Sequence, residues 1–238
     1  LVSPSPTTLD LHSVHYLAGS NDAYSVGNTG VGIKSTDNGA SWSAMNTGLG
    51  TILHKVYFPN SSIGYFCGNN GNIYKTTDAG VSWVEQSSGI TVNINDLHFS
   101  SINHGIAVGA LGKIYYTNDG GTNWSEVSSG VNTDLKAVFL VNSTVGYACG
   151  IGGNIIKTTN GGLSWGQTTS GTNVSFNDIY FTSELIGYVV GDGGKIMKTT
   201  NGMHWGFLAS GTTNNLNGVT FTSNATQGYV VGDAGTIV

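Results

Sequence analysis

Hydrophobic residues recur along this chain in short, evenly spaced segments. Six segments share the pattern apolar-x-x-apolar-x-apolar, which predicts a half-buried strand. They begin at Leu11, Leu53, Ile94, Leu135, Phe176 and Leu216. A second apolar run follows each of them and ends at a glycine, with 41 residues from one glycine to the next. These glycines are Gly27, Gly68, Gly109, Gly150, Gly191 and Gly232.

Two further predicted strands complete each unit. After the second run, a short turn closes on another glycine and leads to a third strand. That strand ends at Lys34, Lys75, Tyr116, Lys157 or Lys198. A fourth strand follows each tryptophan and ends in Thr-Gly or Ser-Gly. Four short strands separated by turn signals, returning at a period near 41, are typical of the blades of a β-propeller.

The turn before each tryptophan is the most constant part of the unit. Its first copy, residues 35–42, reads Ser-Thr-Asp-Asn-Gly-Ala-Ser-Trp; the last two copies have Asn for Asp, and the fifth is one residue shorter. We expect the Asp or Asn side chain to bond a backbone N–H two residues on, and the glycine to take a positive φ. The indole then packs as an apolar plug. The residues with this structural role are Asp37, Trp42, Asp78, Trp83, Asp119, Trp124, Asn160, Trp165, Asn201 and Trp205.

This turn resembles the Asp-box, or bacterial neuraminidase repeat, S/T-x-D-x-G-x-S/T-W. The longer unit, G-Y-x-V-G-x-x-G-x-I-x-K-T-T-D-G-G-x-S-W, is similar to the propeller repeats of photosystem II assembly and stability factors and of sortilin-like proteins. The resemblance covers nearly the whole chain and implies an all-β propeller of four-stranded antiparallel blades. In those families the Asp-box turns mostly support structure away from the active site, so the resemblance implies little about function.

The strands count to six blades with one turn missing. Six first, six second and six third strands are predicted, but only five fourth strands. Residues 1–16 align without a gap to residues 206–221, which matches Leu1–Ser3 to a fourth strand. We therefore expect a single domain over residues 1–238, in which residues 1–8 complete the last blade and close the ring. The alternative is seven or more blades, should the natural chain extend past Val238.

Composition excludes several classes of function. Charged residues make up 9% of the chain, against about 25% in ordinary soluble domains. The net charge is −5, with lysines but no arginine, so we expect no nucleic-acid partner. No apolar run approaches the roughly 20 residues of a membrane helix, so we expect no membrane insertion. Abundant Asn, Thr and Ser favour an extracytoplasmic protein, secreted or at the cell surface, of bacterial origin.

The cysteines and histidines form no metal-binding pattern. Cys67 and Cys149 stand where other units have Val in the second strand, so we expect buried free thiols. No His-x-x-x-His or Cys-His spacing occurs, and we expect neither a metal nor a cofactor.

Catalysis is the second class of function to consider. Sialidases of this propeller type bind their substrate carboxylate with arginines, which this chain lacks. A glycoside hydrolase of Asp-box propeller type needs two carboxylates across a cleft. The candidates are Asp96, Asp134, Asp178, Asp192 and Asp233. They fall on repeat-equivalent positions and no inserted loop builds a cleft, so a non-catalytic module is favoured. An assembly scaffold for a membrane complex is the third class.

The hypothesis for a site is a rim of loops at the blade ends opposite the Asp-box turns. Two repeat positions vary there while the scaffold around them repeats. The candidate ligand-binding residues are His12, Asn28, His54, Asn69, Asn95, Asp96, Lys136, Asn177, Asp178, Asp192, Asn217 and Asp233. Amides, carboxylates and imidazoles suit hydrogen bonding to sugars or peptides. We therefore expect a binding or interaction module, of the adhesin or surface-assembly type, with a glycan or protein partner.

Overall fold

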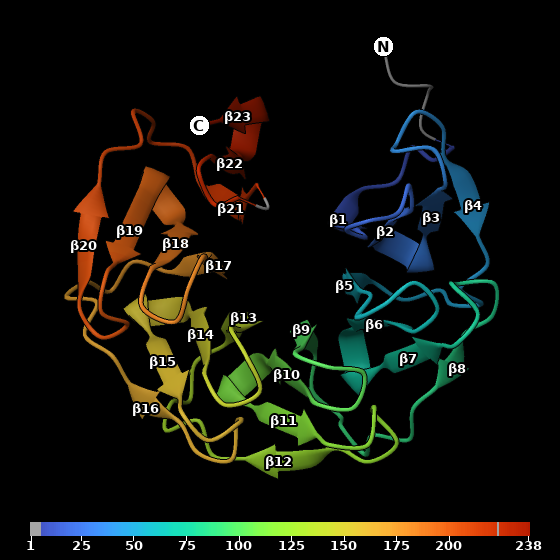
Figure 1. Ribbon diagram of the computed structural model, residues 1–238, viewed down its shortest axis with the longest axis horizontal. Coiled ribbons are helices and arrows are strands. Elements are labelled where there is room, and N and C mark those ends of the chain that lie inside the picture. Colours follow the sequence, from blue (N-terminus) through green and yellow to red (C-terminus); the bar gives the residue numbers. More distant parts are fainter. Residues whose placement is uncertain (1–5, 223) are drawn as a thin grey trace. The chain divides into compact units, whose positions relative to one another are not determined.

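The computed structural model describes residues 6–222 and 224–238, and its strands form sheets of one kind (Figure 1). Every described strand pair is antiparallel, and each sheet follows the order of the chain. Within the described residues, five sheets have four strands and the last, β21-β22-β23, has three. The predicted fold class is confirmed: the chain is an all-β, six-bladed β-propeller.

The strands fall at the predicted places in each repeat. The first strands are β1 (Leu11–Tyr16), β5 (Leu53–Tyr57), β9 (Ile94–Phe99), β13 (Leu135–Leu140), β17 (Phe176–Phe181) and β21 (Leu216–Phe221). The second strands are β2 (Ala23–Gly27), β6 (Gly64–Gly68), β10 (Gly105–Gly109), β14 (Gly146–Gly150), β18 (Gly187–Gly191) and β22 (Gly228–Gly232). The third strands are β3 (Gly32–Ser35), β7 (Ile73–Thr76), β11 (Ile114–Thr117), β15 (Ile155–Thr158), β19 (Lys195–Thr199) and β23 (Thr236–Ile237). The fourth strands are β4 (Ser43–Met45), β8 (Val84–Glu85), β12 (Ser125–Val127), β16 (Gly166–Gln167) and β20 (Trp205–Leu208).

A single 3₁₀ turn joins the second strand to the third in every repeat. These turns are η1 (Asn28–Gly30), η2 (Asn69–Gly71), η3 (Ala110–Gly112), η4 (Ile151–Gly153), η5 (Asp192–Gly194) and η6 (Asp233–Gly235). The middle residue is left-handed even where it is not glycine, as at Leu111 with φ 57°. Residues other than glycine rarely adopt a positive φ, so the turn holds Leu111 in an unfavourable backbone conformation.

The chain divides into two compact units, each with its own core. The first comprises Leu1–Ala107 and Thr117–Ser125, and the second comprises Val108–Tyr116 and Glu126–Val238. Tyr24, Phe58 and Phe66 are buried in the core of the first unit. Tyr147 and Phe181 are buried in the core of the second.

Consecutive blades within a unit are joined by three aromatic rings. Tyr24 of β2 stacks on Phe58 of the next blade, with ring centroids 3.7 Å apart, and Trp83 meets the same Phe58 edge-on at 6.0 Å. The same triads are Tyr65–Phe99–Trp124 and Tyr147–Phe181–Trp205. A β-carbon at Gly64 would lie 2.4 Å from the Phe58 ring, which explains a glycine at the start of β6. Stacked and edge-on aromatic pairs stabilise beyond their burial alone, so the Trp plug acts between blades.

The Asp-box turns hold themselves together with hydrogen bonds, but over a longer span than the sequence analysis predicts. Asp37 Oδ1 accepts from the backbone N–H of Ser41, four residues on rather than two, at 2.8 Å. Ser41 Oγ donates to Asp37 Oδ2 at 2.6 Å. The longer span arises because two consecutive residues, Asn38 and Gly39, have positive φ and widen the turn. Asn201, in the shortened fifth copy, does bond two residues on, to Met203 N–H.

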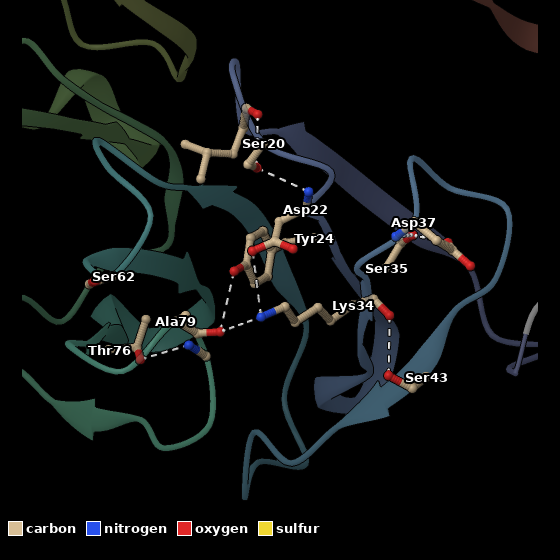
Figure 2. Close-up of polar contacts among 12 residues, drawn as sticks. Ser20, Asp22, Tyr24, Lys34, Ser35, Asp37, Ser43, Ser62, Thr76 and Ala79 are labelled. Atoms are coloured by element: carbon tan, nitrogen blue, oxygen red, sulfur yellow. Dashed lines mark hydrogen bonds and ion pairs between the residues drawn. The ribbon is translucent and has the colours of Figure 1, made fainter.

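The carbonyl groups of these turns also bind the preceding blade. Figure 2 shows Tyr24 and Lys34 of the first blade pointing at Ala79, in the Asp-box turn of the second. Tyr24 Oη donates to the Ala79 carbonyl at 3.3 Å and Lys34 Nζ donates to it at 3.1 Å. Asp22 lies 3.8 Å from Lys34 Nζ, and burial together with Asp22 raises the pKa of Tyr24 to about 12. The tyrosine is therefore a neutral donor at physiological pH.

The predicted closing strand at Leu1–Ser3 lies outside the described residues. Residues 6–8, the described end of the segment expected to complete the last blade, form no strand. Ring closure and the single-domain assignment therefore stay predictions.

Candidate functional site

A β-bulge creates the rim position at the start of five blades. In the first sheet Leu11 pairs with Gly27 and Ser13 pairs with Val26, so His12 has no partner in the ladder. The same shift occurs at the starts of β5, β13, β17 and β21. A bulge leaves one residue unpaired and re-aims its side chain. The residues placed in this way are His12, His54, Lys136, Asn177 and Asn217.

In four blades the bulge residue bonds the first residue of the 3₁₀ turn. His12 Nε2 lies 2.7 Å from Asn28 Oδ1, and His54 Nε2 lies 2.8 Å from Asn69 Oδ1. In the second unit, Asn177 Nδ2 donates to Asp192 at 3.0 Å and Asn217 Nδ2 donates to Asp233 at 2.7 Å. We call these four pairs the rim pairs. They link two of the predicted site positions directly, which spacing alone did not indicate.

The first rim pair has a defined orientation. Asn28 Nδ2 donates to Asp10 Oδ2 at 3.1 Å, which turns its carbonyl oxygen toward His12. Because an amide oxygen only accepts, His12 Nε2 carries the hydrogen in this bond. The other ring nitrogen, Nδ1, is then available to an incoming group. The His12 and His54 rings are neighbours, with centroids 6.2 Å apart.

Two predicted site residues have structural bonds instead. Asp96 is 3% exposed and its carboxylate lies 3.0 Å from Lys55 Nζ in an ion pair between neighbouring first strands. Asp178 accepts from the backbone N–H of Ile179 at 2.9 Å and of Val219, in the next first strand, at 2.8 Å. Asp178 follows the bulge by one residue, and Asp96 stands at the same place in its repeat; both side chains bond between strands. The remaining candidates, Asn95 and Lys136, belong to repeats whose turns begin with Ala110 and Ile151, which cannot form a rim pair.

One set of rim residues was not predicted among the ligand-binding residues. Asn93, Asp134 and Asn215 each precede a first strand and accept from the middle N–H of the preceding 3₁₀ turn. The donors are Asn70, Leu111 and Gly193, at 3.0, 2.9 and 3.0 Å. An Asn or Asp directly before the first strand, repeating at about 41 residues, was the signal. These bonds satisfy the N–H of the left-handed residue. In the second and fifth repeats the turn fixed in this way also carries a rim pair.

An aromatic and histidine stack lies farther along the first strands of the first unit. Tyr57 lies between His15, at 4.9 Å, and His98, at 4.6 Å, measured between ring centroids. Burial and the nearby Lys55 lower the pKa of His15 to about 4 and that of His98 to about 3. Both imidazoles are therefore neutral at physiological pH.

The two cysteines lie in the second strands and belong to no rim pair. Cys67 and Cys149 are free and buried, and burial raises the pKa of the Cys67 thiol. Among the described residues, no helix is both long enough and apolar enough to span a bilayer.

The sheets, the bonded turns and the tryptophan plugs together define an Asp-box, or BNR-repeat, β-propeller. A family model described as photosynthesis system II assembly factor YCF48 matches residues 76–168. A search of curated proteins gives no match.

Three solved structures share the fold at low sequence identity. YCF48 bound to D1 peptide is 20% identical, with a TM-score of 0.77 over 96% of this chain and 76% of that one. YCF48 from Cyanidioschyzon merolae is 16% identical, with a TM-score of 0.74 over 98% of this chain and 96% of that one. An ancestral GH74 enzyme is 16% identical, with a TM-score of 0.80, but only 36% of its chain is covered, against 98% of this one.

Proposed function

We propose that this propeller is a non-catalytic binding and assembly module whose rim pairs hold an extended segment of a partner protein. The observation that carries the proposal is the repeated bulge, which presents a polar side chain already fixed by a second one. Groups held in place before binding lose less conformational entropy when a ligand arrives. Each contact then contributes about 1 kcal/mol, as an ordinary hydrogen bond does.

The chemistry of the rim suits a peptide backbone. In the first unit His12 offers an acceptor and the amide of Asn69 offers a donor, and a peptide presents both kinds of group along its length. The family-model match and the structure of YCF48 with a D1 peptide support a protein partner over a glycan. The proposal includes an extracytoplasmic location, for which the low charged content of 9% is the support.

The experiment is selection from a random linear peptide library and a glycan array, both with the wild-type protein. Binding of the selected ligands is then measured with a His12→Ala, His54→Ala variant, which removes two neighbouring rim residues of the first unit. Losing two contacts of about 1 kcal/mol each weakens binding about 30-fold. A selected ligand that binds this variant as tightly as wild type shows that the rim is not the site.

A matched control tests the opposite end of the blades. Val81 and Val84 are 78% and 64% exposed beside the second Asp-box turn. A Val81→Ser, Val84→Ser variant is expected to bind the selected peptides unchanged. If the glycan array yields ligands and the peptide library yields none, the ligand of the rim is a sugar and the proposed peptide partner is wrong.

A further inference from the structure

A groove at the outer edge of the fifth blade has an apolar wall and a lysine. Its volume is about 700 Å³, and it lies between the start of β19 and the end of β20 with the loop that follows. Phe207 and Leu208 of β20 are 56% and 44% exposed. Lys195 Nζ lies 5.5 Å from the centroid of the Phe207 ring. None of the groove residues belongs to a rim pair.

The third blade shows what this lysine position binds when a carboxylate is present. Lys113, 82 residues before Lys195, lines the matching groove of about 430 Å³ and forms an ion pair with Glu126. Glu126 stands two residues after its Asp-box tryptophan, and Phe207 stands two residues after Trp205. The fifth blade therefore keeps the lysine but has an exposed ring where the third has the carboxylate. Among the ion pairs of the described residues, none includes Lys195.

The strand beside the groove is also suited to pair with another chain. β20 is hydrogen-bonded to β19 on one side only and is the outer strand of its sheet. It runs over four residues, whereas β8 and β16 run over two. An edge strand leaves backbone groups open to an added strand, and exposed apolar side chains favour that addition.

We propose that this groove binds an extended peptide segment of a partner protein in which acidic and aliphatic residues alternate. A carboxylate of the peptide pairs with Lys195, in the way that Glu126 pairs with Lys113. Phe207 and Leu208 lie on opposite faces of β20, so an alternating strand that continues the sheet sets its carboxylate beside Lys195 and Phe207 and an aliphatic side chain on Leu208. The charge complement selects an acidic segment, because the groove offers one cation and no anion of its own.

The experiment is a titration of the ¹⁵N-labelled protein with the capped peptide Leu-Glu-Leu-Glu-Leu and with its Gln-for-Glu counterpart. Amide shifts are expected at 193–195 and 206–213, with tighter binding of the acidic peptide. Lys195→Met is expected to weaken binding about threefold, the range of a solvent-exposed ion pair. Phe207→Glu, which gives Lys195 a carboxylate within its own blade, is expected to weaken it at least about tenfold.

Two controls separate this site from the rim. Lys113→Met removes a lysine that already has a partner and is expected to leave binding unchanged, as is the His12→Ala, His54→Ala variant. Equal binding of the Gln peptide, unchanged binding by Phe207→Glu, or shifts confined to the rim would overturn the groove proposal. Those results would leave the proposed function of the rim standing. If peptide binds the groove but no ligand binds the rim, the groove proposal stands and the proposed function of the rim fails. Thermal melting of each variant confirms that it is folded.

Discussion

Tyr65 and Lys75 donate to the same acceptor, the carbonyl oxygen of Gly120 in the next Asp-box turn, at 2.9 and 2.8 Å. Tyr65 is fully buried, so its hydroxyl has no water to replace this bond. Tyr65→Phe is expected to lower the free energy of unfolding by about 1 kcal/mol, the net value of one hydrogen bond. The loss stays small because Lys75 still satisfies the carbonyl.

The shared acceptor also predicts how the two changes combine. The Tyr65→Phe, Lys75→Met double variant leaves the carbonyl without either donor, so its loss should exceed the sum of the single losses. Urea denaturation of the four proteins measures this coupling. Tyr188→Phe is the matched control, because the Tyr188 hydroxyl forms no hydrogen bond with the described residues. Additive losses at 65 and 75 would contradict the interpretation.

Acid should destabilise the first unit through its histidine stack. The pKa values of His15 and His98 are lowered from 6.5 to about 4 and about 3, chiefly by burial and then by Lys55. The unfolded chain therefore binds protons that the folded chain excludes, and stability falls as the pH drops from 6.5 toward 3. The other groups in the stack are Tyr57 and the Lys55–Asp96 ion pair.

Replacing a histidine with the residue of another repeat tests this directly. Phe139 occupies in β13 the position that His98 has in β9. His98→Phe is expected to reduce the loss of stability between pH 6.5 and 3, measured by urea midpoints across that range. His204→Asn, at an exposed position, serves as the control and should follow the wild-type curve. An unchanged pH dependence in His98→Phe would contradict the prediction.

The Asp-box carboxylates should add a second loss of stability in acid, at lower pH than that of the histidines. The Ser82 hydroxyl, at 2.6 Å, followed by the Ser82 backbone N–H, lowers the pKa of Asp78 from 3.8 to about 2. A lowered carboxyl pKa stabilises the fold above pH 3.8, and this contribution is lost as the pH falls through about 2. Asp78→Ala should remove it and lower the melting temperature at neutral pH.

Asp78→Asn distinguishes charge from hydrogen bonding. Asn160 keeps the bond to Ser164 N–H at 3.0 Å through its own Oδ1, and its Nδ2 donates to Ser164 Oγ. The Asn variant should therefore melt between wild type and Asp78→Ala, and should lose the acid dependence below pH 3.8. If Asp78→Asn has the same melting temperature as Asp78→Ala, the carboxylate charge, rather than the hydrogen bonds of the loop, accounts for the stabilisation.

Leu111 offers a stabilising substitution. Its φ of 57° is unfavourable for a side chain, and that side chain is 62% exposed. Leu111→Gly should raise the free energy of unfolding by about 0.5 kcal/mol, because relief of the left-handed strain exceeds the added freedom of the unfolded chain. Ile151→Gly, at a turn position without positive φ, is the control and should be destabilising. Chemical denaturation measures both, and destabilisation by Leu111→Gly would contradict the strain argument.

The sequence predicted the parts of this fold that depend on neighbouring residues. Asp37, Gly39 and Trp42 are close in the chain, so turn chemistry and spacing were enough to place them. The bond from Lys34 to Ala79 joins residues 45 apart, and no local pattern indicates it. Repetition supplied the blade count, since each unit repeats the same short-range signals.

The candidate site was harder to predict because it depends on register. The bulge was present in the sequence as two non-apolar residues in succession, at 12–13 and 54–55, where a regular strand would alternate. If the bulge is not recognised, Asp96 and Asp178 are placed next to the rim residues. In the structure each stands one position farther along its strand, and its side chain bonds to a neighbouring strand. Register is therefore what separates the rim pairs from the carboxylates that bond between strands.

The interlock between blades also bears on how such a gene can change. The fifth Asp-box turn is one residue shorter, and there Tyr147 donates to the Glu184 carbonyl, at 3.2 Å, instead of to a carbonyl of the turn. Recombination between repeat copies of equal length preserves the match between a tyrosine and its acceptor. Exchange with the shortened copy changes the acceptor on the neighbouring blade. A one-residue deletion in an Asp-box turn therefore has to remain compatible with the tyrosine of the preceding blade. Sequence changes in one repeat in this way limit the changes that the neighbouring repeat tolerates.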